Sequence, residues 1–220
     1  LANQRALVTA GPTHEPLDPV RFIGNHSSGK MGIAIAEELA AQGAAVTLVL
    51  GPTHLRPQNQ HIQVVTVQSA QQMYEACATL FAEMDIAVLA AAVADYRPKT
   101  FSEQKLKKRD DDLSIELLKT VDIAATLGKL KRPEQIFVGF ALETNDEEAH
   151  AQAKMQKKNF DFIVLNSMQD AGAGFGYDTN QVSIFRRDGS RQSSGRRRAA
   201  ARPHPSPRSR AASPSPARGE

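Results

Sequence analysis

The sequence predicts an α/β fold, a doubly wound and mostly parallel Rossmann-like sheet with helices on both faces. Short apolar runs such as Arg5–Ala10 and Ala45–Leu50 alternate with amphipathic stretches of helical period. The run Asp85–Val93 is apolar after its first residue, as expected of a central parallel strand that is covered on both faces. This alternation of strands and helices is typical of a sheet built from parallel crossover units.

The remaining strands are predicted from further short apolar runs that end near Gly, Pro or Asp. These runs are Ile62–Val67, Leu113–Leu118, Gln135–Leu142 and Phe162–Leu165, with one arm of a hairpin at Val182–Phe185 before Arg187-Asp188-Gly189. Ligands of doubly wound sheets bind beyond the carboxyl ends of the strands. The loops after Ala10, Val93 and Leu142 are therefore expected to build the site.

Four helices are predicted between these strands, at 29–42, 70–84, 122–131 and 147–158. The first has Ser27 and Ser28 as candidate caps and Gly43 as its stop. We expect its apolar face to consist of Met31, Ile35 and Leu39. The second helix presents Met73, Cys77 and Leu80–Phe81 on one side. The strongly charged stretch Pro98–Asp112 has no clear period, and we expect a mobile flap loop there.

The charge is unevenly distributed, which divides the chain into two parts. The whole chain has a net charge of +3, but residues 191–220 hold eight Arg and one Glu. The preceding part therefore carries 19 basic and 23 acidic residues, a net charge of −4, which argues against a groove for nucleic acid. We predict one domain over residues 1–190 and a disordered tail over 191–220, because that tail has no apolar residue beyond alanine.

The lone cysteine and the hydropathy pattern favour a cytoplasmic protein. Cys77 cannot form an intramolecular disulfide, and its helical spacing among apolar residues favours a place in the core over a nucleophilic role. No signal peptide is recognised at the start of the sequence. No run approaches the roughly 18 apolar residues that span a bilayer, so no membrane contact is expected.

A phosphate site is predicted at the start of the first helix. Gly24–Met31 nearly matches the pattern G-x-x-x-x-G-K-[ST], but Met31 stands where a hydroxyl should reach the metal. Ser27, Ser28 and Gly29 still open a helix, where free N–H groups and the helix dipole favour an anion. Ordinary capping by serine is the alternative.

Two groups of cationic residues are further candidates for binding a polyanion. Lys154 and Lys158 lie four residues apart on one helix face, a spacing that suits a triphosphate or simply a solvated surface. Lys105, Lys107, Lys108 and Arg109 lie in the charged loop, which is able to close over a polyanion and stabilise charge or is simply exposed to solvent. No His/Cys/Asp/Glu cluster has the spacing of a metal site.

Several motifs, in the same order along the chain, resemble those of the bacterial phosphopantothenoylcysteine synthetase family. The resemblance extends over about residues 5–188. It rests on the string Ala10–Gly32 (AGPTHEPLDPVRFIGNHSSGKMG), on Ala91–Arg97 (AAVADYR), on Lys105–Lys108 (KLKK), on Gly139–Thr144 (GFALET) and on Lys158-Asn159.

The resemblance implies a ligase of coenzyme A biosynthesis that joins 4′-phosphopantothenate to L-cysteine and uses CTP and Mg²⁺. The phosphopantothenate carboxylate would attack CTP and release pyrophosphate, and the cysteine amine would attack the acyl-cytidylate and release CMP. The resemblance also implies a homodimer, in which flap residues complete the site across the interface. A flavin-dependent decarboxylase, to which this domain is often fused, is an expected associate.

The resemblance assigns roles to individual residues. Asn25 should hold and polarise the acyl-cytidylate, and Lys105 should enter from the flap as the cationic catalytic group. Arg21 matches a family arginine near the active site and the subunit interface. The positions that match nucleotide contacts of the family are Leu89, Ala90, Ala91, Asp95, Val121, Asp122, Ile123, Ala124, Phe140, Lys154 and Lys158. Mg²⁺ is expected on the nucleotide phosphates.

The sequence departs from the family in two places. Many relatives carry Asn-Pro where this chain has Thr120-Val121, and the tail from residue 191 replaces structured chain. A nucleotide-binding Rossmann-like domain without catalysis is therefore one alternative. A nicotinamide-dependent oxidoreductase is another, but it predicts a glycine fingerprint after Ala10, where the sequence has Gly11-Pro12.

Overall fold

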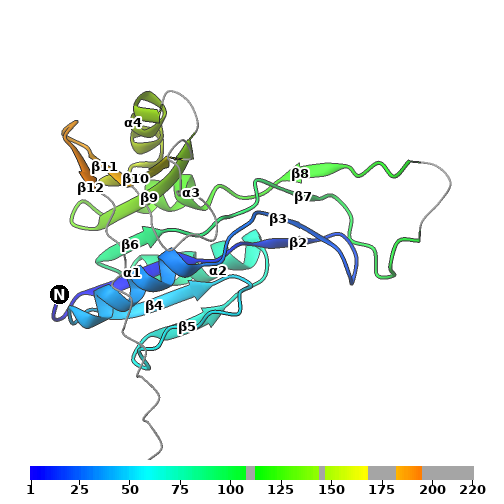
Figure 1. Ribbon diagram of the computed structural model, residues 1–220, viewed down its shortest axis with the longest axis horizontal. Helices are drawn as coiled ribbons and strands as arrows, with labels where there is room; N and C mark the ends of the chain where they lie inside the picture. The colour runs from blue at the N-terminus through cyan, green and yellow to red at the C-terminus, as the bar shows by residue number, and fades with distance from the viewer. Residues whose placement is uncertain (108–111, 144–146, 168–181, 195–220) are drawn as a thin grey trace, which may run out of the picture.

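The protein is described by a computed structural model that covers residues 1–107, 112–143, 147–167 and 182–194. Its centre is an eight-stranded sheet (Figure 1). In chain order the strands of this sheet are β1 (Arg5–Ala10), β4 (Ala45–Leu50), β5 (Gln63–Thr66), β6 (Ile86–Leu89), β9 (Ile136–Glu143), β10 (Phe162–Ser167), β11 (Val182–Arg186) and β12 (Arg191–Ser194). The predicted α/β fold class is confirmed.

The strand order identifies the doubly wound topology. Across the sheet the strands lie in the order β12-β11-β10-β9-β6-β1-β4-β5, and β5 to β10 pair in parallel. Numbered along the chain, these six strands follow the order 3-2-1-4-5-6 of dinucleotide-binding folds. The order reverses between β1 and β6, which is where such folds bind their ligands. Strands β11 and β12 add an antiparallel edge.

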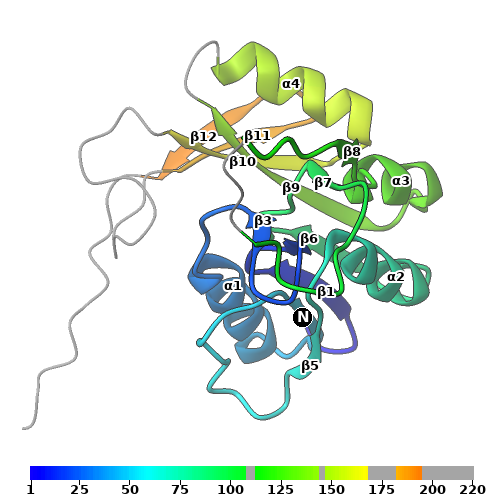
Figure 2. The ribbon, with the colours of Figure 1, turned by 90° about the vertical axis from the view of Figure 1, so that its right-hand side faces the viewer.

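Helices cover both faces of the sheet (Figure 2). Helix α1 (Lys30–Ala41) lies on one face, and α2 (Ala70–Phe81), α3 (Ile123–Leu130) and α4 (Glu147–Lys158) lie on the other. Side chains of β1 alternate between the two layers, as a strand requires. Val8 belongs to the core under α1, whereas Leu7 belongs to the core under α2 and α3.

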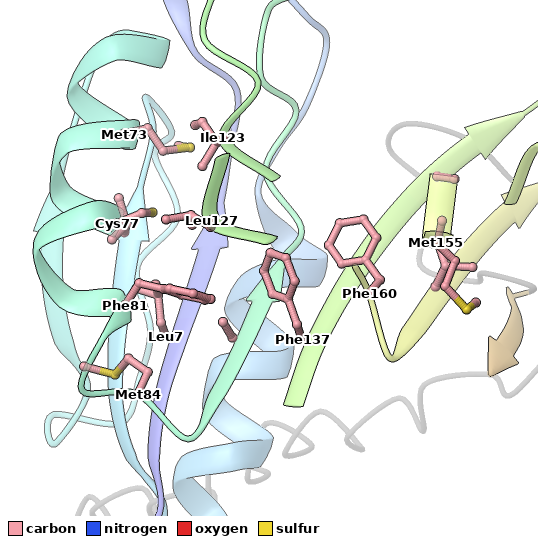
Figure 3. Packing of buried hydrophobic residues seen from close by; sticks show 14 of the residues in the cluster. Leu7, Met73, Cys77, Phe81, Met84, Ile123, Leu127, Phe137, Met155 and Phe160 are labelled. Carbon is pink, nitrogen blue, oxygen red and sulfur yellow. The ribbon is translucent and has the colours of Figure 1, made fainter. Parts of the chain in front are cut away.

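The larger core is organised by three phenylalanines. Figure 3 shows Phe81 of α2, Phe137 of β9 and Phe160 following one another across the sheet face. The Phe81 and Phe137 rings meet edge to face with centroids 5.5 Å apart, and Phe137 and Phe160 are 4.7 Å apart. Cys77 is buried in the same cluster, as predicted. Such aromatic pairs stabilise a core beyond the burial of their area.

The predicted apolar face of α1 is only partly right, since Ile35 and Leu39 pack against the core but are not its most buried residues. The helix buries Gly32, Ile33 and Ala36 instead of Met31, Ile35 and Leu39, which are only partly buried. The reason is the small size of Gly32. A Cβ atom at this position would lie 2.5 Å from the Cβ of Ala10, so the helix packs against β1 closely through its smallest residues. The predicted stop is confirmed, since Gly43 adopts a left-handed φ of +93° after the helix ends.

Two short hairpins extend from the carboxyl edge of the sheet (Figure 1). One pairs β2 (His14–Pro16) with β3 (Phe22–Gly24), and the other pairs β7 (Tyr96–Pro98) with β8 (Leu117–Lys119). The prediction of an unstructured loop from Pro98 and of a strand over Leu113–Leu118 is therefore wrong in its bounds. Residues 96–107 and 112–119 form an arm whose base is a two-stranded ladder.

The predicted domain boundary at residue 190 is also wrong. Arg191–Ser194 form β12 and pair with β11, so the sheet continues into the segment assigned to the tail. The rest of the predicted tail, 195–220, lies outside the described residues, as do Lys108 and Thr144 of the family motifs. Among the described residues, no helix is long and apolar enough to cross a membrane.

Candidate functional site

A central cavity of about 470 Å³ lies at the carboxyl ends of β1, β6 and β9, on the side covered by α2, α3 and α4. Every residue predicted to contact the nucleotide lines it except Ala90. The predicted lining residues are Leu89, Ala91, Asp95, Val121, Asp122, Ile123, Ala124, Phe140, Lys154 and Lys158. Four segments far apart in the sequence therefore converge on one site, at the place where the strand order reverses.

The segment after β6 forms one wall of the central cavity. Ala90 and Ala92 donate backbone hydrogen bonds to Thr9 and Gly11, at 3.2 and 2.9 Å, so the chain continues beside the end of β1. The predicted strand Asp85–Val93 thus stays next to β1, although regular strand geometry ends at Leu89. Ala90 itself points its backbone N–H at β1 and is absent from the cavity lining.

Two threonines fix the loop that carries Asp95. The buried Thr13 hydroxyl accepts a hydrogen bond from the Ala94 N–H at 2.9 Å. The Thr120 hydroxyl donates to the Ala94 carbonyl at 2.6 Å, and the Thr120 N–H donates to the Asp95 carbonyl at 2.9 Å. Thr120-Val121, where the resemblance leads us to expect Asn-Pro, is therefore attached to the wall, with Val121 in the lining.

The N-terminus of α3 meets α4 at an ion pair in the cavity wall. Asp122 caps α3 by accepting from the Ala125 N–H at 3.0 Å, and the Lys158 ammonium lies 3.1 Å from the same carboxylate oxygen. Burial opposes ionisation of Asp122, but the hydrogen bonds from Ala125 and Lys158 outweigh it and lower the pKa of the carboxyl group. Lys158 is thereby held at the cavity with its side chain 24% exposed.

Lys154 and Lys158 both line the central cavity, which favours the polyanion interpretation of their spacing over that of a solvated surface. They lie one helical turn apart on α4, so their ammonium groups are presented together. Lys119 at the end of β8 lines the same cavity. The cavity lining therefore includes three cationic side chains and two carboxylates, Asp95 and Asp122, and Asp122 is paired with Lys158.

A second cavity of about 700 Å³ lies beside the N-terminus of α1, and we call it the N-terminal cavity. Its lining residues are His14, Ser27, Ser28, Leu50, Gly51, Pro52, Thr53, His54, Leu55, Arg56, Thr66 and Val67. Ser27 and Ser28 were predicted to bind a phosphate, and they open onto this cavity. Gly29 is the N-cap of α1, with φ +76°, and does not line the cavity.

The serines make weak hydrogen bonds with the start of α1. The Gly29 N–H lies 3.3 Å from the Ser27 hydroxyl oxygen, and the Lys30 N–H lies 3.4 Å from that of Ser28. The Ser28 carbonyl accepts a 2.7 Å hydrogen bond from Thr53, which fixes the loop against the end of β4. Gly29 is required here, because a Cβ would lie 3.1 Å from the backbone nitrogen of Gly11.

Asn25 lines neither cavity but lies next to residues that line each of them. It follows β3 directly, two residues before Ser27, which lines the N-terminal cavity. Its side-chain amide donates a 2.9 Å hydrogen bond to the carbonyl of Val93, which lines the central cavity. The Asn25 side chain is exposed.

Arg21 and Lys105 lie outside both cavity linings. Arg21 belongs to the turn between β2 and β3, where its guanidinium pairs with Asp18 at 2.6 Å. Lys105 lies on the arm and is exposed. Within one copy of the described chain, the two predicted catalytic residues are therefore not brought to one cavity.

Several site residues were missed by sequence reasoning. Thr9, Met73 and Tyr96 line the central cavity, and His14 and Arg56 line the N-terminal cavity. Burial lowers the pKa of His14, although the nearby Glu15 charge opposes this effect, so the imidazole is neutral at neutral pH. The missed side chains come from elements far apart in the sequence, among them β1, β2, α2 and β7, which only the fold brings together. Local sequence patterns carry no signal for that.

The described part of the chain contains no cluster of side chains that could hold a metal ion without other ligands. Residues 1–107, 112–143, 147–167 and 182–194 contain no group of three or more His, Cys, Asp or Glu that could hold an ion. The carboxylates that line the central cavity are Asp95 and Asp122, and the latter is paired with Lys158. The donor set therefore fits a cation that arrives on a phosphate better than one held by protein alone.

Comparison with known protein families shows which family the chain belongs to. The profile of the family described as "DNA/pantothenate metabolism flavoprotein C-terminal domain" matches residues 1–202. The chain belongs to this family. The resemblance predicted from the motifs is confirmed at this level.

Curated relatives in the family are about twice as long as this chain. The coenzyme A biosynthesis bifunctional protein CoaBC of Bacillus subtilis (strain 168) is 48% identical over 189 residues, 86% of this chain and 46% of that protein. CoaBC of Escherichia coli (strain K12) is 44% identical over 192 residues, 86% of this chain and 47% of that protein. A relative from an unknown prokaryotic organism, named cysteine/cysteine sulfinic acid decarboxylase, is 56% identical over 185 residues, 84% and 52% of the two chains. The chain thus spans about half the length of these relatives.

The solved structure of the C-terminal domain of a CoaBC protein has the same fold. It is 43% identical to this chain, with a TM-score of 0.75, and the match covers 89% of this chain and 87% of that one. A DNA/pantothenate metabolism flavoprotein from Streptococcus pneumoniae, 22% identical with a TM-score of 0.75, shares the fold and covers 87% and 92% of the two chains. The family domain thus corresponds to the C-terminal part of the CoaBC relatives.

Proposed function

We propose that this domain is a ligase of coenzyme A biosynthesis that joins 4′-phosphopantothenate to L-cysteine at the expense of CTP. The observation that carries the proposal is the pair of cavities together with Asn25, which donates to Val93 in the lining of one and lies two residues before Ser27 in the lining of the other. The central cavity presents Lys154 and Lys158, and the N-terminal cavity presents Ser27 and Ser28, which precede α1. Two phosphate-bearing substrates would thereby approach each other at a single carboxamide.

The central cavity suits the nucleotide. Lys154 and Lys158 would bind the triphosphate, and the loop that carries Asp95 together with Val121–Ala124 would enclose the rest of the nucleotide. The Lys158 ammonium is already desolvated in part and oriented by Asp122, so less reorganisation is required when phosphate arrives. The choice of CTP over ATP rests on the resemblance to bacterial members.

The N-terminal cavity suits 4′-phosphopantothenate. Ser27, Ser28 and the first N–H groups of α1 would receive its phosphate, where the helix dipole favours negative charge. The pantothenate carboxylate would then reach toward Asn25. The carboxylate oxygen would attack the α-phosphorus of CTP, the bond to the β-phosphate would break, and pyrophosphate would leave.

Amide formation completes the proposed reaction. The amine of L-cysteine would attack the carbonyl of the acyl-cytidylate and lose a proton, and CMP would leave. The carboxamide of Asn25 would donate to the oxygen on which negative charge develops, and Lys105 would supply a positive charge from the arm. Mg²⁺ bound to the nucleotide phosphates would neutralise part of their charge.

A homodimer would bring Lys105 to the site. Lys105 lies outside both cavities of its own copy, and the hairpins around it expose large apolar side chains. Phe22 is 53% exposed and Phe101 is 54% exposed, which is unusual for a surface without a partner. We propose that two copies associate through this arm and complete each other's sites. We also propose a cytoplasmic location and an association with a flavin-dependent decarboxylase; the latter accords with the bifunctional relatives.

One relative is named as a decarboxylase, but the match covers only 52% of that protein, so its name does not support a decarboxylase activity for this chain. A nucleotide-binding domain without catalysis is the competing function, because a CTP-binding cavity alone does not require turnover. It predicts CTP binding without pyrophosphate release.

The test is pyrophosphate release from CTP and Mg²⁺ with 4′-phosphopantothenate, measured with and without L-cysteine, beside ATP and an Asn25→Ala variant. We expect release that depends on phosphopantothenate, prefers CTP and yields CMP only when cysteine is added. Asn25→Ala should lower the rate of intermediate formation by about 10²-fold, the usual loss when one stabilising donor is removed. CTP binding by a folded protein that never releases pyrophosphate would reject the ligase.

A further inference from the structure

A buried carboxylate joins the β2–β3 hairpin to the part of the arm that carries Lys105, residues 102–107, which we call the strap. The Asp18 side chain is 0% exposed. Its Oδ1 accepts hydrogen bonds from the backbone N–H groups of Val20 and Arg21, both at 2.8 Å. Its Oδ2 accepts from Nε and Nη2 of Arg21, at 3.0 and 2.6 Å. A fifth donor, the backbone N–H of Leu106, reaches the same Oδ2 at 3.1 Å.

Leu106, the residue after Lys105, is held by both of its backbone polar groups. The Leu106 N–H donates to Asp18, and the Leu106 carbonyl accepts a 2.8 Å hydrogen bond from Nη2 of Arg21. A second link lies close by, because the Ser102 N–H donates to the Leu17 carbonyl at 3.0 Å. The backbone of Lys105 is therefore fixed to the hairpin, although its side chain is exposed.

Only an ionised carboxylate matches this arrangement of donors. A carboxylate offers acceptor sites on both oxygens, whereas an amide of the same shape replaces one oxygen with a donor. An Asn at position 18 would direct its NH₂ group either at the two backbone donors or at Leu106 and the guanidinium. The Arg21 side chain, aided by the backbone N–H groups, holds the pKa of the Asp18 carboxyl well below its usual range, so the acceptor persists at neutral pH.

We propose that Asp18 is a positioning residue for the reaction, which sets the place of Lys105 by clamping the Leu106 peptide. The inference rests on the proposed function, in which Lys105 is a cationic catalytic group. Asp18 lines neither cavity, so its effect would pass through the strap rather than through contact with a substrate. The alternative is that Asp18 only stabilises the β2–β3 turn.

A double-mutant cycle separates the two roles. We expect Asp18→Asn to lower kcat for pyrophosphate release by at least about tenfold with little change in the KM for CTP, because misplacement of a catalytic group is costly. In a Lys105→Ala background the same substitution should cost less than about twofold, since residues that act as a unit are not additive. Glu116→Gln is the matched control: it removes an exposed ion pair with Lys99 on the same arm and should leave kcat unchanged.

A second variant approaches the same hydrogen bond from its other end. Leu106→Pro removes the N–H donor while Asp18 and Arg21 remain, and it lies in a partly exposed strap away from the core. It should reproduce both the loss and the non-additivity with Lys105→Ala. Amide hydrogen exchange of Leu106 should accelerate by at least about tenfold in Asp18→Asn, while the amides of β1 stay protected.

The outcomes separate the two proposals. Equal losses for Asp18→Asn in the wild-type and Lys105→Ala backgrounds, or unchanged exchange at Leu106, would overturn the positioning role while the ligase stands. No pyrophosphate release from the folded wild-type protein would instead overturn the proposed function, and with it the role of Asp18 in catalysis.

Discussion

Lys154 offers a residue-scale test of the central cavity. The chain supplies a matched control on the same helix, because Lys157 is exposed and lies outside the cavity lining. If Lys154 binds the triphosphate, Lys154→Ala should raise the KM for CTP at least about tenfold, the loss expected for a hydrogen bond to a charged group. Lys157→Ala removes the same charge from α4 and should change the KM by less than about twofold.

Initial rates at varied CTP check this prediction. Equal effects of the two substitutions would mean that α4 acts only through the electrostatic potential of all its cationic side chains. The assignment of Lys154 to the phosphates would then fail. Repeating the comparison at high salt adds a second criterion. Electrostatic interactions between exposed charges are screened over about 10 Å at 0.1 M salt. The interaction of Lys154 with a phosphate in a partly enclosed cavity would be screened much less.

Cys77 illustrates how burial determines reactivity at the same scale. The thiol is fully buried among Met73, Phe81 and their neighbours, and burial raises its pKa to about 12. The thiolate is the reactive form, so we expect native protein at pH 8 to resist iodoacetamide and denatured protein to react fully. Mass spectrometry of the alkylated peptide measures both states. Rapid native alkylation would contradict the predicted core position.

At Gly32, helix propensity and the packing of α1 against the sheet predict opposite effects of a substitution. Alanine is a better helix former than glycine by about 1 kcal/mol, so propensity alone predicts that Gly32→Ala stabilises α1. The Cβ of alanine would instead lie 2.5 Å from Ala10 and push the helix away from β1. We expect a net destabilisation of about 1–3 kcal/mol, as for an overpacked core.

Urea unfolding of Gly32→Ala and of Ala34→Gly measures the balance between propensity and packing. Ala34 is exposed on the same helix, so Ala34→Gly should cost only the propensity difference, about 1 kcal/mol. A more stable Gly32→Ala protein would show that α1 is free to shift on the sheet, and that close packing against β1 is not required.

The elements that sequence reasoning predicted are those with a strong periodic or apolar pattern. α4 was predicted at its observed bounds, Glu147–Lys158, and the core strands were predicted within a few residues. The arm was not, because β7 and β8 are short, largely exposed and joined only through a long-range ladder. Strands are predicted from the periodicity of apolar residues, and a strand that buries few side chains has no such periodicity.

The candidate site was predicted by resemblance more than by local chemistry. Spacing alone left Lys154 and Lys158 open between a ligand site and a solvated surface, and the strand order brought them to the cavity that Leu89 and Phe140 also line. Asp18 was not singled out at all, since a lone Asp in a Pro-rich turn is ordinary in sequence. The five hydrogen bonds that its carboxylate accepts involve Val20, Arg21 and Leu106, and only the folded chain brings Leu106 to Asp18.

The whole molecule raises the question of which copy supplies Lys105 to a given site. The arm extends away from the sheet (Figure 1). Lys105 belongs to the arm by its number and lines neither cavity. A symmetric pair of copies would exchange arms through the same surface on each, as an isologous interface requires. Each active site would then combine Asn25 of one copy with Lys105 of the other.

Mixed dimers test this exchange directly. Asn25→Ala and Lys105→Ala proteins should each be nearly inactive alone. If Lys105 acts across the interface, a mixed dimer holds one site with both native residues. Random pairing makes half of the dimers mixed, so an equimolar mixture should regain about a quarter of wild-type pyrophosphate release. If Lys105 serves its own copy, every site in the mixture lacks one residue and no activity returns, although sedimentation would still report a dimer.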